Sequence, residues 1–148
     1  MNPVTCATAD DLRAWGRQLA TQLPPFTILV LVGELGAGKT TLMQGVAVGW
    51  GVAREDQIAS PTYTLVHEYR CDRRWMLHLD LYRVESGAQL DTLGLEDVLL
   101  PPPPGEEKLV AIEWGERLEV SLPHPYLRIG ISTDPVTDVR TLTPHWVR

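Results

Sequence analysis

Residues 27–42 read TILVLVGELGAGKTTL and give the clearest indication of the fold. This stretch opens on a run of apolar and β-branched residues, 27–32, without the alternation of a half-exposed strand, which is typical of a strand buried on both faces of a parallel sheet. Residues 33–40 then fit the pattern G-x-x-x-x-G-K-[ST] of a phosphate-binding loop, or P-loop. Residues 39–50 carry apolar side chains at helical spacing. The stretch therefore predicts a strand, a P-loop and a helix in direct succession.

The glycines of the loop explain why it would bind phosphate. Glycine lets the backbone curl so that successive N–H groups point inward, at the N-terminus of a helix whose dipole also favours negative charge. The Lys39 ammonium group would then contact the β- and γ-phosphates, and the Thr40 hydroxyl would bind Mg²⁺. Proteins that read guanine usually carry Asn-Lys-x-Asp, and this chain has one asparagine, Asn2. The motif therefore predicts nucleotide binding and favours ATP.

Length, composition and charge restrict the remaining possibilities. The 148 residues are 44% hydrophobic and 22% charged, which suits one domain over residues 1–148. A net charge of −6 leaves no overall basic surface for unaided binding of nucleic acid. Cys6 and Cys71 form no CxxC pair and are predicted to be free thiols, as in the reduced cytosol. No secretory signal is visible and the apolar run 26–32 is too short to span a bilayer, so we expect a cytoplasmic protein.

The rest of the chain alternates predicted helices and strands. A capping box opens a helix over residues 9–23, and the prolines that follow end it. Further elements are expected, in chain order, as a hairpin of strands 63–69 and 75–81, one or two short helices over 86–100, a buried strand over 108–114, and closing strands over 126–132 and 139–147. Strands that alternate with helices indicate an α/β sandwich in which antiparallel strands extend a parallel core.

Two acidic residues, Asp80 and Glu113, each end a predicted apolar strand. A P-loop protein needs such a carboxylate, because Mg²⁺ bound by one hydroxyl and by phosphate requires further oxygen ligands, direct or through water. Either residue could bind the metal, and one could bind it directly while the other orients water. The alternative for both is a strand-end carboxylate that faces solvent or pairs with an arginine such as Arg83 or Arg117.

Thr62 lies in the Ser-Pro-Thr segment 60–62, between the predicted P-loop helix and the next strand. Nucleotide switches place a threonine there to sense the γ-phosphate and Mg²⁺, although Ser-Pro-Thr is also ordinary turn chemistry. No arginine finger and no glutamine that would position water stands out in the sequence. Slow hydrolysis that a partner accelerates is therefore expected.

Two other groups of residues have weaker signals. The arginines at the predicted hairpin turn, Arg70, Arg73 and Arg74, either are solvated or contact a partner protein or tRNA phosphate. The four histidines share no metal-ligand spacing, so structural or surface roles are expected for them. Neither group changes the prediction of a nucleotide site.

Five motifs occur in a fixed order along nearly the whole chain: GELGAGKTTL (33–42), SPTYTLVHEY (60–69), HLDLYR (78–83), LGLEDVL (93–99) and IEWGERL (112–118). This set resembles the TsaE family, also called YjeE-like proteins, the small ATPases of bacterial tRNA threonylcarbamoyladenosine synthesis. The resemblance implies a P-loop NTPase-like three-layer sandwich, with a mixed, partly parallel sheet flanked by helices.

The resemblance also assigns roles to individual residues. Asp80 corresponds to the strand-end acid required for ATP hydrolysis and Thr62 to the switch threonine, while Trp114 is either part of the site or a core aromatic. Magnesium would be bound by Thr40 and Glu113, with Asp80 in direct or water-mediated contact. The implied catalytic residues are Lys39, Asp80, Thr62 and Glu113. The implied nucleotide-binding residues are Gly33, Glu34, Leu35, Gly36, Ala37, Gly38, Lys39, Thr40, Thr41 and Trp114.

The implied function is that of an accessory subunit dependent on ATP and Mg²⁺. It would act with TsaB-like and TsaD-like proteins, which attach threonylcarbamoyl to the adenosine beside the tRNA anticodon. The tRNA would be contacted only within that complex, and neither membrane binding nor stable DNA binding is expected. Two rivals remain: a small-molecule kinase that passes the γ-phosphate to an acceptor, and a nucleotide-sensing interaction module without useful turnover.

Overall fold

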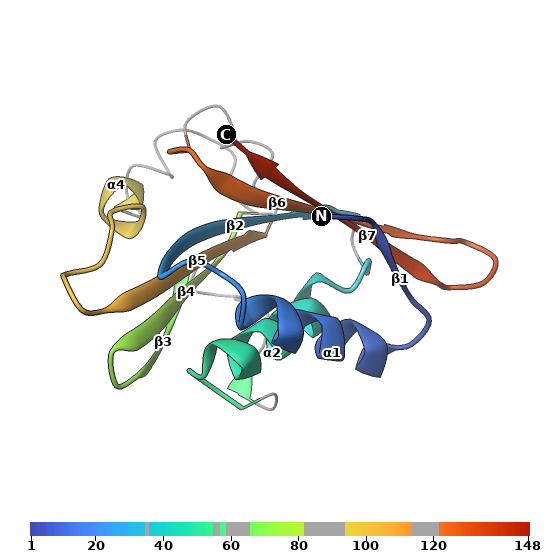
Figure 1. The fold of residues 1–148 in the computed structure, drawn as a ribbon. Helices are drawn as coiled ribbons and strands as arrows, with labels where there is room; N and C mark the ends of the chain where they lie inside the picture. Colours follow the sequence, from blue (N-terminus) through green and yellow to red (C-terminus); the bar gives the residue numbers. More distant parts are fainter. Residues whose placement is uncertain (35, 55–56, 59–65, 82–93, 114–121) are drawn as a thin grey trace.

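The computed structural model describes residues 1–34, 36–54, 57–58, 66–81, 94–113 and 122–148 (Figure 1). Within these residues the strands form a seven-stranded sheet in the order β1-β7-β6-β2-β5-β4-β3. The elements are β1 (Val4–Cys6), α1 (Ala9–Ala20), β2 (Phe26–Gly33), α2 (Lys39–Trp50), β3 (Val66–Cys71), β4 (Arg74–Asp80), α4 (Leu95–Val98), β5 (Glu107–Glu113), β6 (Tyr126–Thr133) and β7 (Arg140–Val147).

Strand β2 lies at the centre of the sheet and has parallel neighbours on both sides, β5 and β6. Its residues 27–31 are buried, as the uninterrupted apolar run predicts for a strand covered on both faces. Strand β4 continues the parallel part beyond β5, and the outer strands β3, β7 and β1 pair antiparallel. The expectation of a parallel core extended by antiparallel strands is therefore confirmed.

Helices lie on both faces of the sheet (Figure 1). Helices α1 and α2 cover one face, where Leu12 and Leu42 belong to the larger apolar core. On the other face, Leu95 and Val98 of α4 pack against a second core that includes Val30 of β2. The described part of the chain thus has the predicted layers of helix, sheet and helix.

Helices α1 and α2 pack with their backbones unusually close. A Cβ atom added to Gly45 would lie 2.1 Å from the Arg13 carbonyl oxygen, and one added to Gly49 would lie 2.2 Å from that of Arg17. Both glycines lower the helix propensity of α2, so by propensity alone they weaken the prediction of this helix. Their role is to let α1 lie directly on the helix that begins at the P-loop.

We expect Gly45→Ala to destabilise the protein by about 1–3 kcal/mol, because its methyl group would collide with the α1 backbone. Urea unfolding at neutral pH measures this free energy of unfolding. The matched control is Gly130→Ala on β6, where the nearest atom to the new Cβ is 3.9 Å away, and we expect it to change stability by no more than about 0.5 kcal/mol. Equal stability of the two variants would contradict the close packing.

Most element boundaries differ slightly from the predictions. Helix α1 ends at Ala20 rather than at residue 23, because Pro24 disfavours helical backbone at the residue before it. Strand β1 was not predicted, since a segment of three residues has too little periodicity and is ordered by pairing with β7. The short helix α4 lies inside the predicted region 86–100, whose part 86–93 lies outside the described residues, as do 63–65 of the predicted strand 63–69.

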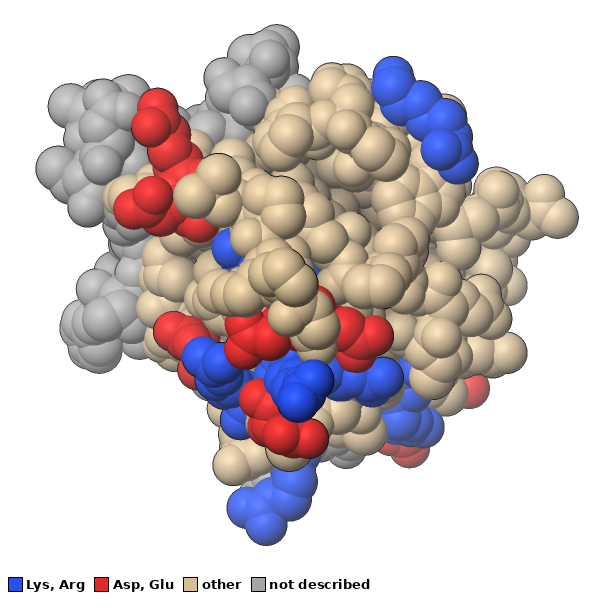
Figure 2. Space-filling model, turned by 60° about the vertical axis from the view of Figure 1, so that its left-hand side comes forward, with Lys and Arg blue, Asp and Glu red and all other residues tan. Residues whose placement is uncertain are grey.

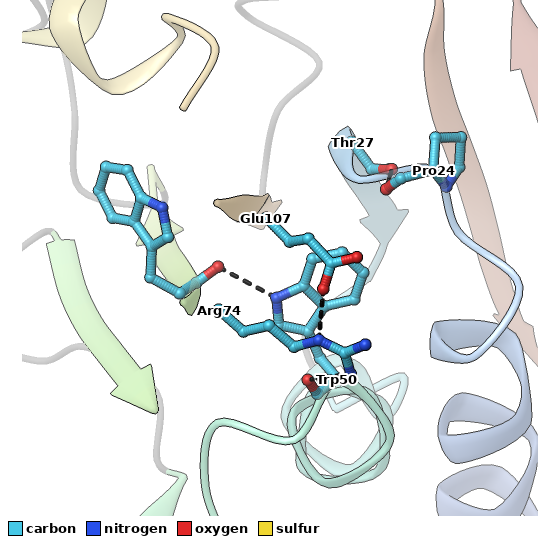
Figure 3. A network of polar contacts seen from close by, with 6 residues as sticks. Pro24, Thr27, Trp50, Arg74 and Glu107 are labelled. Atoms are coloured by element: carbon cyan, nitrogen blue, oxygen red, sulfur yellow. Dashed lines mark hydrogen bonds and ion pairs between the residues drawn. The ribbon is translucent and has the colours of Figure 1, made fainter. Parts of the chain in front are cut away.

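The end of the sheet away from the P-loop is held together by a polar network (Figure 3). The side chain of Arg74 pairs with Glu107 and also donates a hydrogen bond of 3.3 Å to the Trp50 carbonyl at the end of α2. The Trp50 indole in turn donates to the Trp75 carbonyl at 3.1 Å. These contacts fasten the C-terminus of α2 to strands β4 and β5.

The hairpin arginines have intramolecular partners. Arg70 Nη2 lies 2.5 Å from Glu106 Oε1, and Arg74 pairs with Glu107 as described above. Figure 2 brings this side of the molecule forward and shows basic and acidic side chains interleaved on one part of the surface. Of the two readings of the arginine cluster, these ion pairs favour a solvated, internally paired turn for Arg70 and Arg74.

Candidate nucleotide site

The P-loop begins at the carboxyl end of β2 and leads directly into α2. Two of its glycines have left-handed backbone, with φ of 79° at Gly36 and 103° at Gly38. A side chain would strain both positions, whereas glycine adopts them freely. Gly38 is the N-cap of α2 and offers no side-chain cap, and the N-terminus of a helix favours an anion.

The side chain of Lys39 folds back into this loop. It is only 6% exposed, and its Nζ donates hydrogen bonds to the carbonyl oxygens of Gly33 at 2.5 Å and Glu34 at 3.1 Å. These contacts place the ammonium group against the loop whose N–H groups would bind phosphate. Lys39 thus lies where the P-loop pattern requires it.

An arginine from the other end of the chain supports the loop. Arg140, the first residue of β7, donates from Nε to the Ala37 carbonyl at 2.9 Å. A Cβ atom on Gly38 would come within 3.0 Å of the same Nε. Sequence reasoning missed Arg140, because the contact spans 103 residues and depends on the position of β7 in the sheet.

Strand register brings the two predicted carboxylates to the P-loop end of the sheet. Glu113 is the last residue of β5 and pairs with Leu31 of β2, two residues before Gly33. Asp80 ends β4 and pairs with Glu113 itself. Because the parallel strands β2, β5 and β4 end at the same edge, Asp80 and Glu113 lie side by side next to the strand that feeds the loop. Two other predicted site residues, Thr62 and Trp114, lie outside the described residues, as does Leu35 of the loop.

Glu113 has a buried histidine as its partner. The carboxylate is 2% exposed and its Oε2 lies 2.5 Å from Nε2 of His78, which is 0% exposed. A buried histidine with a side-chain partner agrees with the structural role expected for the histidines, and the partner is a predicted metal ligand. The signal was present in the sequence: His78 interrupts an otherwise apolar strand two residues before Asp80.

The oxygen donors at this edge fit a magnesium ion. Thr40 is the second residue of α2, and Glu113 and Asp80 supply carboxylates, which are the hard ligands that Mg²⁺ prefers. Among the described residues, no group of three or more His, Cys, Asp or Glu side chains could hold a metal ion by itself. A magnesium ion here would take its other ligands from phosphate and water, as is usual in nucleotide enzymes.

A cleft of about 580 Å³ opens beside the P-loop. It is lined on one side by loop residues, among them Gly33 and Ala37, and on the other by β6 and β7, with Arg128, Ser132 and Thr143. Its volume lies in the range of small-molecule sites, and it lies at the carboxyl end of the parallel strands, where ligands bind in open α/β sheets.

Comparison with known proteins identifies the family. A family model described as threonylcarbamoyl adenosine biosynthesis protein TsaE matches residues 6–142. The chain belongs to the TsaE family. A family member from Synechocystis sp., named tRNA threonylcarbamoyladenosine biosynthesis protein TsaE, is 48% identical over 116 residues, which are 73% of this chain and 68% of that protein. One from Mycobacterium leprae is 35% identical over 147 residues, 97% of this chain and 90% of that protein.

A solved structure agrees with the fold. YdiB of Bacillus subtilis superposes with a TM-score of 0.71 at 28% identity, over 99% of this chain and 86% of that one. The resemblance to the TsaE family and the α/β fold with a mixed, partly parallel sheet are therefore both confirmed. As for membranes, no helix within the described residues is long and apolar enough to cross one.

The Arg140 contact predicts a local effect on the loop. We expect Arg140→Met to accelerate hydrogen exchange of the Ala37 and Leu42 amides, which donate to the Glu34 and Gly38 carbonyls, by about 5- to 10-fold, which is the loss of a net hydrogen bond of roughly 1 kcal/mol. Exchange followed by mass spectrometry measures this. Arg148→Met at the chain end is the control and should leave these amides unchanged. If the two variants exchange alike, Arg140 does not order the loop.

Proposed function

We propose that this chain is a Mg²⁺-dependent ATP-binding and ATP-hydrolysing subunit, formed as a single domain over residues 1–148. It would serve the formation of threonylcarbamoyladenosine beside the tRNA anticodon through TsaB-like and TsaD-like proteins in the cytoplasm. The observation that carries the proposal is the position of Glu113, buried at the end of the strand next to β2 and its P-loop. Membership in the TsaE family supplies the biological context.

Each residue of the site has a separate role in ATP binding and hydrolysis. The backbone of residues 33–41 and the Lys39 ammonium group bind and orient the phosphates. Thr40 and Glu113 would hold the magnesium ion, which when bound neutralises charge on the phosphate oxygens. Asp80 lies next to Glu113 and would orient the attacking water. Thr62 as a switch and Trp114 as part of the site stay predictions from the sequence.

Regulation by partners follows from the same set of residues. Neither an arginine finger nor a glutamine for the attacking water is part of the proposed machinery, so hydrolysis by the chain alone should be slow. ATP binding or hydrolysis would reset the partner complex, and the threonylcarbamoyl group itself would be transferred by the partners. The tRNA would be contacted within that complex.

The first experiment measures phosphate release from MgATP by the chain alone and with TsaB-like and TsaD-like proteins and tRNA. We expect slow release alone, a rise of about 10-fold or more with the partners, and loss of both with Lys39→Ala, because the phosphates lose their cation. Fast release without partners, or no response to them, would contradict an accessory role and favour the search for a phosphoryl acceptor.

Asp80→Asn separates binding from hydrolysis. We expect it to lower ATP hydrolysis by about 100-fold or more, the effect of losing a positioned carboxylate, while the ATP dissociation constant changes little. The matched control is Asp138→Asn, in the turn between β6 and β7, where φ of 62° suits asparagine as well as aspartate. Hydrolysis by Asp80→Asn at the rate of the control would remove Asp80 from the catalytic set.

A further inference from the structure

The His78–Glu113 contact joins two buried polar side chains inside the sheet. His78 pairs in register with Ala111 on β5, and Glu113 follows Ala111 by two residues, so both side chains point to the face covered by α2. Glu113 lies at the edge of the sheet where the P-loop begins, and His78 lies two residues farther into the sheet, so Nε2 approaches Glu113 from the interior. Nε2 lies 2.5 Å from Oε2, within hydrogen-bonding distance.

The direction of this hydrogen bond follows from the chemistry of the site. With magnesium bound to it, the Glu113 carboxylate would be ionised and could only accept hydrogen bonds, so Nε2 of His78 would be the donor to Oε2. The second oxygen, Oε1, is the one that a metal ion or its bound water would use.

Filling space is a weaker explanation for this histidine. Met76 and Ala111, which lie beside His78 on the same face of the sheet, are apolar and buried, so an aliphatic side chain at position 78 would pack there without leaving a polar atom behind. Nδ1 of the ring is buried and has no hydrogen-bond partner among the described residues, which carries a cost of about 1–3 kcal/mol. The hydrogen bond to Glu113 is the favourable interaction that offsets this unfavourable free energy.

We propose that His78 is a positioning residue for Glu113, fixing the carboxylate so that its free oxygen faces the magnesium ion of a nucleotide in the P-loop. This inference rests on the proposed function, because it presupposes metal and nucleotide at this edge. It adds a residue to the site that the P-loop motif does not contain. Residues that hold a metal ligand from behind typically change metal affinity by about 10- to 100-fold when replaced.

The test measures metal binding without turnover, using Mn²⁺ and ADP as the probes. Electron paramagnetic resonance gives the Mn²⁺ affinity of the ADP-loaded protein, and a fluorescent ADP analogue in EDTA gives the nucleotide affinity without metal. We expect His78→Leu to weaken Mn²⁺ binding by about 10- to 100-fold and to leave metal-free nucleotide affinity within about 2-fold. His78→Gln, whose amide can donate to Oε2, should recover Mn²⁺ affinity to within about 3-fold of the wild type.

Two further variants complete the design. His67→Leu makes the same chemical change on β3, directly opposite His78 and one strand farther from Glu113, and should leave Mn²⁺ affinity unchanged. In a Glu113→Gln background, His78→Leu should have no additional effect, because the group that it positions is altered already. Thermal melting confirms that each variant is folded, and His78→Gln keeps a polar side chain at the site if His78→Leu fails to fold.

The outcomes separate this inference from the proposed function. If Glu113→Gln weakens Mn²⁺ binding but His78→Leu does not, or if folded His78→Gln binds Mn²⁺ as poorly as His78→Leu, the positioning role is overturned and the metal site stands. If the wild type binds ADP equally with and without metal and Glu113→Gln changes nothing, the proposed metal site itself fails, and the role of His78 fails with it.

Discussion

The parallel alignment of β2 with β5 is the constraint on which the site depends. Parallel strands end at one edge, and their register fixes which residues meet there. Leu31 pairs with Glu113, and the P-loop begins at Gly33, two residues after Leu31. The carboxylate of Glu113 therefore lies close to the start of the loop. A shift of one residue would turn Glu113 to the opposite face and break the contact with His78. Burial of β2 on both faces is what makes such a shift costly.

A second constraint is the short distance between helices α1 and α2, which cover one face of the sheet. Helix α2 must begin at the end of β2 for its N-terminus to face the loop, and α1 must fit beside it without pushing it away from the sheet. Gly45 and Gly49 allow this approach, since their hypothetical Cβ atoms would lie within 2.2 Å of α1 carbonyl oxygens. Arg140 reaches the loop from β7 and restrains it from the other side. The loop is thus held by contacts from α2, from the sheet and from a strand near the end of the chain.

The sequence predicts the local parts of this arrangement and misses those that depend on tertiary packing. The strand, loop and helix of residues 27–50 follow from composition and glycine placement, because each is determined by neighbours in the chain. Asp80 and Glu113 were found because each ends an apolar strand. The contacts of Arg140 and His78 were not predicted, because their partners, Ala37 and Glu113, are 103 and 35 residues away in sequence. Only the order and register of the strands bring them together.

Burial of a charged group does not by itself indicate function, and the two lysines show why. Lys108 is 2% exposed at the other end of β5, and burial lowers its pKa below the ordinary value. Its Nζ donates 2.7 Å to the Leu100 carbonyl and lies 4.7 Å from the centre of the Trp75 ring, so it fastens the segment after α4 to the sheet.

Lys39 is bound instead to carbonyl groups of the P-loop itself, at the edge where Glu113 ends β5. The difference lies in what each ammonium group can reach. Lys108 contacts a carbonyl after α4 and an aromatic ring of β4, so losing these contacts would release the segment after α4 from the sheet. Lys39 contacts the carbonyls of Gly33, the last residue of β2, and of Glu34 in the loop, so in the proposed function its ammonium group would turn from them to phosphate oxygens at the same place. The groups that a buried side chain contacts, and not its burial alone, therefore distinguish Lys39 from Lys108, and the same holds for His78, whose contact is with a carboxylate at the proposed site.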